Sequence, residues 1–240
     1  MYEVRTYRQL VKGNDLVPFT AMVKESDLFI RAERDLTTEA VAAIIECRRP
    51  LEQYIQVHPL FLHSLKPLEV ADDAPAIVRT MAKAGQMAKV GPMAAVAGAI
   101  AEMVGEKLLR HSGEVIVENG GDIFIQTKKK RLVGIYAGES PFSGKMAIEV
   151  GPGLMPMGVC TSSGTVGPSF SMGLADAAII LSHSAALSDA VATAAGNLVQ
   201  SEDDIPAALE SIRKIKGVLG IAIIKGERMG AWGDINLVRI

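Results

Sequence analysis

Alternating apolar and polar positions predict a series of short strands along the chain. Leu16–Val23 and Ser26–Arg34 both show the period of two that is expected of half-buried strands. Lys12–Asp15, before the first of them, has the residue types of a hairpin turn. Further strands are predicted over Glu3–Leu10, Glu114–Val117, Ile123–Gln126, Leu132–Tyr136, Lys145–Val150, Leu174–Leu181, Val218–Lys225 and Asp234–Ile240.

Apolar residues at helical spacing predict helices between these strands. The first begins at Thr37 or Thr38 and carries an apolar stripe from Val41 to Ile55, and Pro50 is expected to break or kink it. Later helices are predicted from Pro75 to about Ala88, and over Met93–Arg110, Ser184–Val199 and Ser201–Lys214.

The segments between these elements carry glycine, proline or charge. The paired glycines of Glu118–Asp122 indicate a bulge or a close approach of backbone to another group. Lys128–Arg131 is typical of a solvated hairpin tip, and Gly226–Gly233 is predicted to be a turn region. His58–Pro75 is expected to be irregular, with His58 and His63 as surface or loop-packing residues rather than ligands.

Composition narrows the class of protein. The 240 residues, 49% hydrophobic, suffice for one large α/β-type domain or two small ones, and no repeat or linker divides them. A net charge of −2 gives no field to attract nucleic acid or an acidic membrane. We find neither a signal sequence nor a membrane-spanning stretch, and we expect a cytoplasmic protein in which Cys47 and Cys160 are free thiols.

The chain is organised around Gly158–Asn197, a stretch rich in small and hydroxyl residues that contains Asp176 and Asp189. Asp189 and Thr193 are four residues apart, so a helix places their oxygens on one face. Mg²⁺ binds one or two carboxylates and completes its shell with water and phosphate oxygens. The pair is therefore a candidate Mg²⁺ site, although an aspartate early in a helix also serves as a capping or dipole residue.

The segment Thr161–Thr165 offers hydroxyls and backbone amides that suit phosphate or sugar oxygens. It lacks the lysine of a Walker loop, and no G-x-G-x-x-G follows a strand. Ser162 and Ser163 are weak candidates for a nucleophile, because the chain has no G-x-S-x-G elbow and only His183 is near enough in sequence to act as a base.

Three segments together resemble the ApbE-like superfamily, the flavin transferases that move FMN from FAD onto a protein threonine. They are Met93–Glu102, Val117–Ile123, and Thr161–Gly164 followed by Ser188–Thr193. They correspond to the A-K-G-Y-A-V-D helix, the N-x-G-G-(N/D)-I turn, the T-S-G segment and the A-D-A-L-A-T-A helix of that superfamily. The string from Gly158 to Asn197 resembles an uncharacterised branch, the UPF0280 group, most closely.

The resemblance implies a fold and a set of ligand-binding residues. The fold would be a single compact α+β domain over residues 1–240, with a mixed, largely antiparallel sheet and helices packed on it. Asp189 and Thr193 would bind Mg²⁺ together with a main-chain carbonyl near Val96. The residues beside FAD would be Asn119, Gly120, Gly121 and Asp122 at the dinucleotide, and Thr161, Ser162, Ser163 and Gly164 at the flavin and its pyrophosphate.

The chain also departs from the transferase pattern. Ala97 stands at the position of the family lysine and Glu102 at that of its aspartate, and Thr165–Gly167 replaces the tyrosine after T-S-G. Pro168–Gly173 stands in place of the D-P-x-T-G loop. These differences leave three functions open: an Mg²⁺-dependent FMN transferase or FAD pyrophosphate-cleaving enzyme, a flavin- or nucleotide-binding module without catalysis, and an enzyme acting on another phosphorylated cofactor.

The third function would use the replacement loop with His183 or Glu118 as acid or base. In each case the expected partner is a phosphorylated small molecule, and the small-residue helix faces would permit a homodimer. The catalytic residues remain unassigned.

Overall fold

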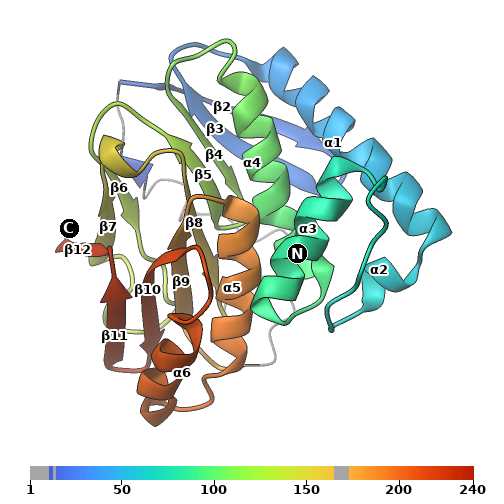
Figure 1. The fold of residues 1–240 in the computed structure, drawn as a ribbon. Helices are drawn as coiled ribbons and strands as arrows, with labels where there is room; N and C mark the ends of the chain where they lie inside the picture. Colours follow the sequence, from blue (N-terminus) through green and yellow to red (C-terminus); the bar gives the residue numbers. More distant parts are fainter. Residues whose placement is uncertain (1–10, 13–14, 165–172) are drawn as a thin grey trace.

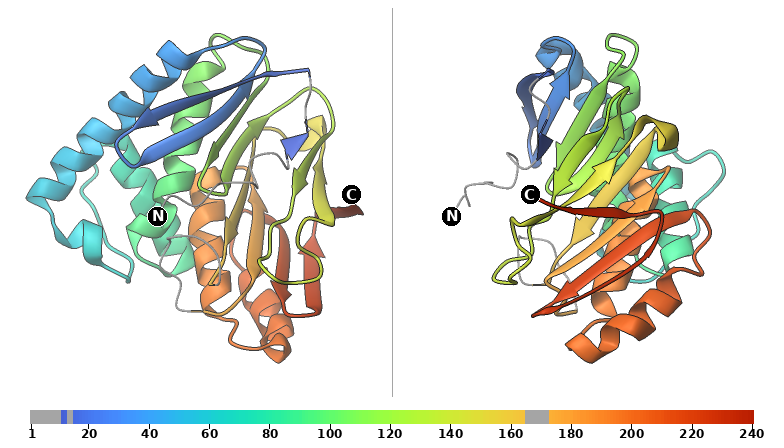
Figure 2. Two further views of the ribbon diagram at one scale, coloured as in Figure 1. Left: turned by 180° about the vertical axis from the view of Figure 1, so that it is seen from behind. Right: turned by 90° about the vertical axis from the view of Figure 1, so that its left-hand side faces the viewer.

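The protein has three layers, with helices on one face of a large sheet and a smaller sheet on the other (Figures 1 and 2). The computed structural model describes residues 11–12, 15–164 and 173–240. The expected strand Glu3–Leu10, Gly13–Asn14 of the expected turn and most of Pro168–Gly173 lie outside the described residues.

The large sheet has eight strands, and every neighbouring pair in it is antiparallel. This confirms the expected α+β class, and no parallel pairing occurs between the strands described. In spatial order the strands are β11 (Arg228–Gly233), β10 (Val218–Lys225), β9 (Ala177–Ser182), β8 (Met157–Ser162), β5 (Asp122–Gln126), β4 (Val115–Asn119), β3 (Ser26–Ala32) and β2 (Val17–Val23).

The smaller sheet has four described strands, also antiparallel, and it covers the face of the large sheet away from the helices (Figure 2). Its order is β1 (Val11–Lys12), β6 (Arg131–Gly134), β7 (Met146–Val150) and β12 (Asn236–Arg239). Val11–Lys12 pairs with β6, while the expected hairpin between Glu3–Leu10 and Leu16–Val23 involves residues outside the described ones and stays a prediction.

Two hydrophobic cores form because successive side chains along the strands of the large sheet point to its two opposite faces. In β5, Phe124 faces the helices, whereas Ile123 and Ile125 face the smaller sheet. Successive side chains of a strand point to opposite faces, so a sheet buried on both sides requires apolar residues at consecutive positions. This explains why β9, Ala177–Ser182, is buried at every residue.

The helical layer packs on the large sheet through small residues. A Cβ on Gly105 would lie 2.2 Å from the ring of Phe124 in β5, so this glycine allows close helix-on-sheet packing. The α-helices are α1 (Thr37–Val57), α2 (Leu60–His63), α3 (Ala76–Ala88), α4 (Val96–Leu108), α5 (Ala185–Asn197) and α6 (Ile205–Ile212); the 3₁₀ turns are η2 (Pro92–Ala95), η3 (Pro152–Leu154) and η4 (Glu202–Asp204).

Of the expected break or kink at Pro50, the break is wrong, because α1 continues through this residue, and the kink stays a prediction. Proline removes one backbone hydrogen bond from a helix and crowds the preceding turn. Cys47 and Leu51, on either side of it, are both buried in the core. Tertiary packing therefore holds the helix together where local preference opposes it.

The expected turn region Gly226–Gly233 is also wrong for most of its length. Only Gly226 and Glu227 form the turn, and Arg228–Gly233 is strand β11, paired with β10. A Cβ on Gly230 would lie 2.6 Å from the Ile205 side chain of α6. The glycine that indicated a turn is instead required by a helix that packs closely on this strand.

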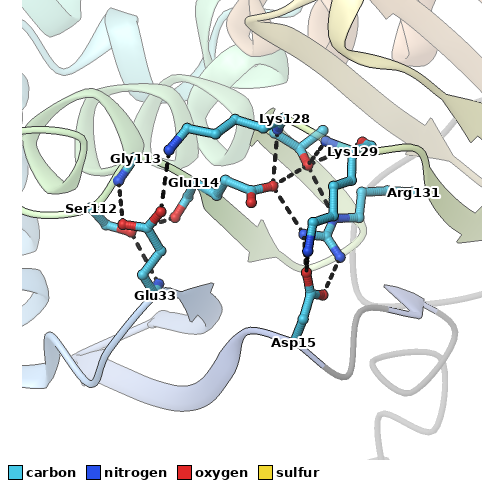
Figure 3. A network of polar contacts seen from close by, with 9 residues as sticks. Asp15, Glu33, Ser112, Gly113, Glu114, Lys128, Lys129 and Arg131 are labelled. Atoms are coloured by element: carbon cyan, nitrogen blue, oxygen red, sulfur yellow. Dashed lines mark hydrogen bonds and ion pairs between the residues drawn. The ribbon is translucent and has the colours of Figure 1, made fainter.

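The basic run Lys128–Arg131 is only in part a solvated tip. Lys128 and Lys129 are exposed, but the Arg131 side chain is 4% exposed and pairs with buried Glu114 at 2.9 Å. Asp15 pairs with the same guanidinium from the exposed side (Figure 3). The run therefore ends in a buried ion pair that ties β6 to the residue preceding β4.

Both cysteines are free and buried, as expected. Among the described residues no single helix has both the length and the hydropathy of a membrane span. The pair formed by α3 and Pro92–Leu108 meets both criteria together, with a bend of 104° between its halves.

Candidate functional site

The turn between β4 and β5 opens onto the N-terminus of α4. Asn119 pairs with Asp122, and Gly120 and Gly121 form a two-residue hairpin turn with φ values of 68° and 103°. Both values lie in the left-handed region that favours glycine, so the glycines are turn residues rather than a bulge. A Cβ on Gly120 would meet nothing within 4 Å, whereas one on Gly121 would lie 3.9 Å from the Thr161 carbonyl.

Two side chains from separate segments hold the first turn of α4. The Asn119 side-chain amide donates to the Ala97 carbonyl at 3.0 Å. The Asp189 carboxylate accepts from the Gly98 backbone amide at 2.8 Å. Three of the segments that the sequence singled out therefore meet at one helix terminus. Asp189 does not cap its own helix, whose N-cap is Ser184, but its carboxylate bonds to the first turn of α4.

Close contact between α4 and α5 brings these residues together. A Cβ on Gly98 would lie 2.2 Å from the Ala185 carbonyl, so only glycine permits this approach. Glu102, one turn further along α4, accepts from the Ser184 hydroxyl at 2.9 Å and from the Ala186 amide at 3.0 Å. Sequence reasoning did not assign this role to Glu102, because its partners lie more than 80 residues away.

Asp122 is a buried acid of the site with an incomplete set of hydrogen bonds. It is 7% exposed, and its Oδ1 atom is buried without a hydrogen-bond partner. Burial raises the pKa of Asp122 well above its usual range, and the charge of Asp189 raises it further. The two carboxylates therefore lie close enough to interact strongly, and neither forms an ion pair with a lysine or arginine of the described chain.

Asp189 also has a perturbed proton affinity. Burial raises the pKa of Asp189 to about 7, against the opposing effect of the Gly98 and Ala97 amides. A group that titrates near neutral pH beside a second buried acid is typical of a functional site. Thr193 lies one helical turn further along α5 and is half-buried, so the structure keeps it on the Asp189 side of the helix.

The Thr161–Gly164 segment ends β8 beside the turn. Ser162 and Ser163 are buried, and Thr161 is half-buried. The Gly164 amide donates to the Ala175 carbonyl at 2.9 Å. That amide is therefore engaged within the protein.

The histidines lie away from this cluster or on the surface. His183 is exposed before the N-terminus of α5, with Nδ1 3.1 Å from the Pro156 carbonyl. His58 is exposed and stacks on Tyr54 with ring centroids 4.3 Å apart, and His63 is exposed in α2. These positions agree with loop-packing and surface roles.

The donor types at the site suit a hard cation. No cluster of three or more histidine, cysteine or acidic residues with metal-binding geometry occurs in the described parts of the chain. A closed zinc site needs such a cluster, whereas Mg²⁺ is commonly held by one or two carboxylates and completed by water and phosphate oxygens. Asp189 and Thr193 offer a carboxylate and a hydroxyl, which are donors of the second type.

Known proteins with the same fold include flavin transferases. The structure superposes on the flavinyl transferase ApbE of Pseudomonas stutzeri with a TM-score of 0.58 and 14% identity, over 90% of this chain and 93% of that one. It superposes on the ApbE protein of Thermotoga maritima with a TM-score of 0.62 and 11% identity, over 90% and 96%. At these identities the likeness establishes the ApbE-type fold.

Sequence comparison identifies the family. The family model described as "AbpE bacteria" matches residues 8–225. A UPF0280 protein of Methanocaldococcus jannaschii is 41% identical over 220 residues, which cover 89% of either chain. A UPF0280 protein of Methanosarcina acetivorans is 40% identical over 216 residues, covering 89% of this chain and 85% of its own. The chain therefore belongs to this ApbE-like family, in the group whose members carry the name UPF0280.

Proposed function

We propose that the cluster around the N-terminus of α4 binds a flavin dinucleotide, with FAD as the reference ligand, together with Mg²⁺. The observation that carries the proposal is that Asn119 and Asp189 meet at the first turn of α4, beside a glycine turn that the end of β8 approaches. The flavin transferase named among the structural relatives shares the fold that creates this convergence.

Each segment has a distinct role in this proposal. The open side of Gly120 leaves space for a ligand against the turn, because no atom lies where a side chain would begin. The hydroxyl of Ser162, which shares the helix side of β8 with Cys160, would donate to phosphate or sugar oxygens. Asp189 and Thr193 would hold the cation, and an ionised carboxylate that accepts one bond from Gly98 retains capacity for a metal ion.

Mg²⁺ bound here would neutralise charge on a pyrophosphate, which assists both binding and cleavage. The chain itself orients the carboxylate: the Gly98 amide fixes the position of Asp189, and Glu102 fixes the start of the helix that carries it. This arrangement favours a cation-dependent binding site whether or not transfer follows.

A thermal-shift titration with FAD, with and without Mg²⁺, tests the proposal. The wild-type midpoint should rise only when both are present, since a ligand at ~100 times its dissociation constant adds about 2.7 kcal/mol of stability. Asp189→Asn should remove the shift while keeping an acceptor for the Gly98 amide. Glu210→Gln, an exposed acid on α6, is the matched control and should respond like the wild type.

No shift with FAD under any condition would overturn the flavin assignment, and a shift with another phosphorylated cofactor would support the third function instead. A second candidate, catalysis of FMN transfer or pyrophosphate cleavage, is tested by the release of AMP from FAD. Binding without AMP release would identify a non-catalytic module. Ala97, at the position of the transferase lysine, favours that outcome because it supplies no charge to the reaction.

A further inference from the structure

The strand register places Asp122 on the same side of the large sheet as α4 and α5. Phe124, two residues further along β5, belongs to the helix-side core, whereas Ile123 faces the smaller sheet. Side chains two residues apart on a strand share a face. The Asp122 carboxylate is therefore directed into the layer between the sheet and the two helices that meet at Gly98.

An ionised carboxylate in this layer requires a compensating partner. Asp122 is 7% exposed and Oδ1 has no hydrogen-bond partner, while most buried polar atoms in proteins have one. The negative charges of Asp189 and Glu118 nearby make an uncompensated charge on Asp122 still more unfavourable. Asp176, a buried acid directly before β9, is by contrast paired with Lys225 at 3.4 Å.

We propose that the Asp122 carboxylate is a further ligand of the divalent cation at Asp189 and Thr193, with Oδ1 as the donor atom. This assignment rests on the proposed cation site and goes beyond it, since it makes the site a two-carboxylate site. Once ionised against the cation, Asp122 adds a second negative charge to the site. The second carboxylate strengthens cation binding in the absence of nucleotide.

Titration with Mn²⁺, monitored by electron paramagnetic resonance without nucleotide, tests the role of Asp122. Asp122→Asn should weaken Mn²⁺ binding about tenfold or more, the range seen when groups around a metal site are altered. Asp189→Asn should weaken it at least as much. Asp176→Asn, the matched control, removes a buried acid that already has a cationic partner and should bind Mn²⁺ within about twofold of the wild type.

The variants separate failure of this inference from failure of the proposed function. Mn²⁺ binding that is unchanged in Asp122→Asn but lost in Asp189→Asn would overturn the role of Asp122 and leave the cation site standing. A wild type that binds no Mn²⁺, with or without FAD, would overturn both. The melting midpoint in EDTA checks folding: Asp122→Asn should be at least as stable as the wild type, because an amide removes an ionisable group that is costly to charge at this buried position.

A second measurement on the wild type avoids substitution altogether. In protein labelled with ¹³C at the aspartate carboxyl carbons, saturating Mg²⁺ should shift the signals of both Asp122 and Asp189. The signal of Asp176 should keep its position. An unmoved Asp122 signal beside a shifted Asp189 signal would overturn the inference.

Discussion

The Asp189 carboxylate lies 2.8 Å from the Gly98 backbone amide, so a side chain from the middle of α5 caps the first turn of α4. The contact depends on the absence of a side chain at Gly98, where a Cβ would lie 2.2 Å from the Ala185 carbonyl and 2.8 Å from the Asp189 Cβ. Helix packing and the geometry of the candidate cation ligand are therefore set by the same glycine.

Gly98→Ala should push the two helices apart and destabilise the protein by about 2 kcal/mol, the usual cost of overfilling a packed contact. Urea denaturation measures this change. Gly153→Ala is the matched control, because a Cβ there would meet nothing within 4 Å, and it should change stability by less than about 0.5 kcal/mol. Equal losses in the two variants would contradict the close contact at Gly98.

Glu102→Gln should weaken the start of α5. Its Oε2 atom accepts bonds from the Ser184 hydroxyl and the Ala186 amide, and a negative charge at a helix N-terminus is favourable. We expect a loss of about 1 kcal/mol in unfolding free energy and faster hydrogen exchange at the Ala186 amide. Glu106→Gln, an exposed acid one turn away on α4, should leave that exchange rate unchanged.

Arg131→Met should be among the most damaging substitutions outside the site. It leaves the Glu114 carboxylate, whose side chain is 7% exposed, without its guanidinium partner at 2.9 Å (Figure 3). Breaking a buried pair in this way costs about 3 kcal/mol or more. The double variant Arg131→Met, Glu114→Gln should regain part of the loss in chemical denaturation, and no recovery would show that packing rather than charge governs this position.

The same network should make stability fall in acid. Hydrogen bonds from Arg131, then from Lys129, hold the pKa of Asp15 well below its usual range. For Glu114, burial alone would raise the pKa, but bonds from Thr127, the Lys128 amide and Arg131 outweigh it, so the pKa is lowered. A folded-state pKa below that of the unfolded chain stabilises the fold above the unfolded value, about pH 4, and this stability is lost as the pH falls.

Unfolding free energy measured from pH 7 to pH 3 checks this expectation. Asp15→Asn should show a shallower decline than the wild type, because one group with a lowered pKa has been removed. Glu139→Gln, an exposed acid without an ion pair in the described chain, should follow the wild-type curve. Identical slopes for Asp15→Asn and the wild type would contradict the ion pair.

Several expectations remain predictions. The single domain over residues 1–240, the homodimer and the cytoplasmic location stay predictions from the sequence. The roles of Asn119–Asp122, Thr161–Gly164, Asp189 and Thr193 in ligand binding likewise await the titrations above.

The sequence by itself determined the elements with strong periodicity. Val218–Lys225 was predicted at its observed bounds, and the helix after Ser184 and the break at Lys89–Pro92 were also predicted correctly, because local patterns and cap residues dominate there. The three motif segments identified the family before their arrangement was known. Short-range chemistry is sufficient for such features, since it needs no partner distant in sequence.

Only the tertiary structure decided how these segments act on one another. Pro50 stays within a helix and Gly230 within a strand because neighbouring elements pack against them, and local propensity is too weak to oppose that packing. The partner of Asp189, the role of Glu102 and the orphaned oxygen of Asp122 arise from contacts between residues far apart in the chain. Burial and charge compensation depend on all the groups around a side chain. The sequence pattern could therefore identify these acids as candidates but could not show which hydrogen-bond or charge partners each of them has.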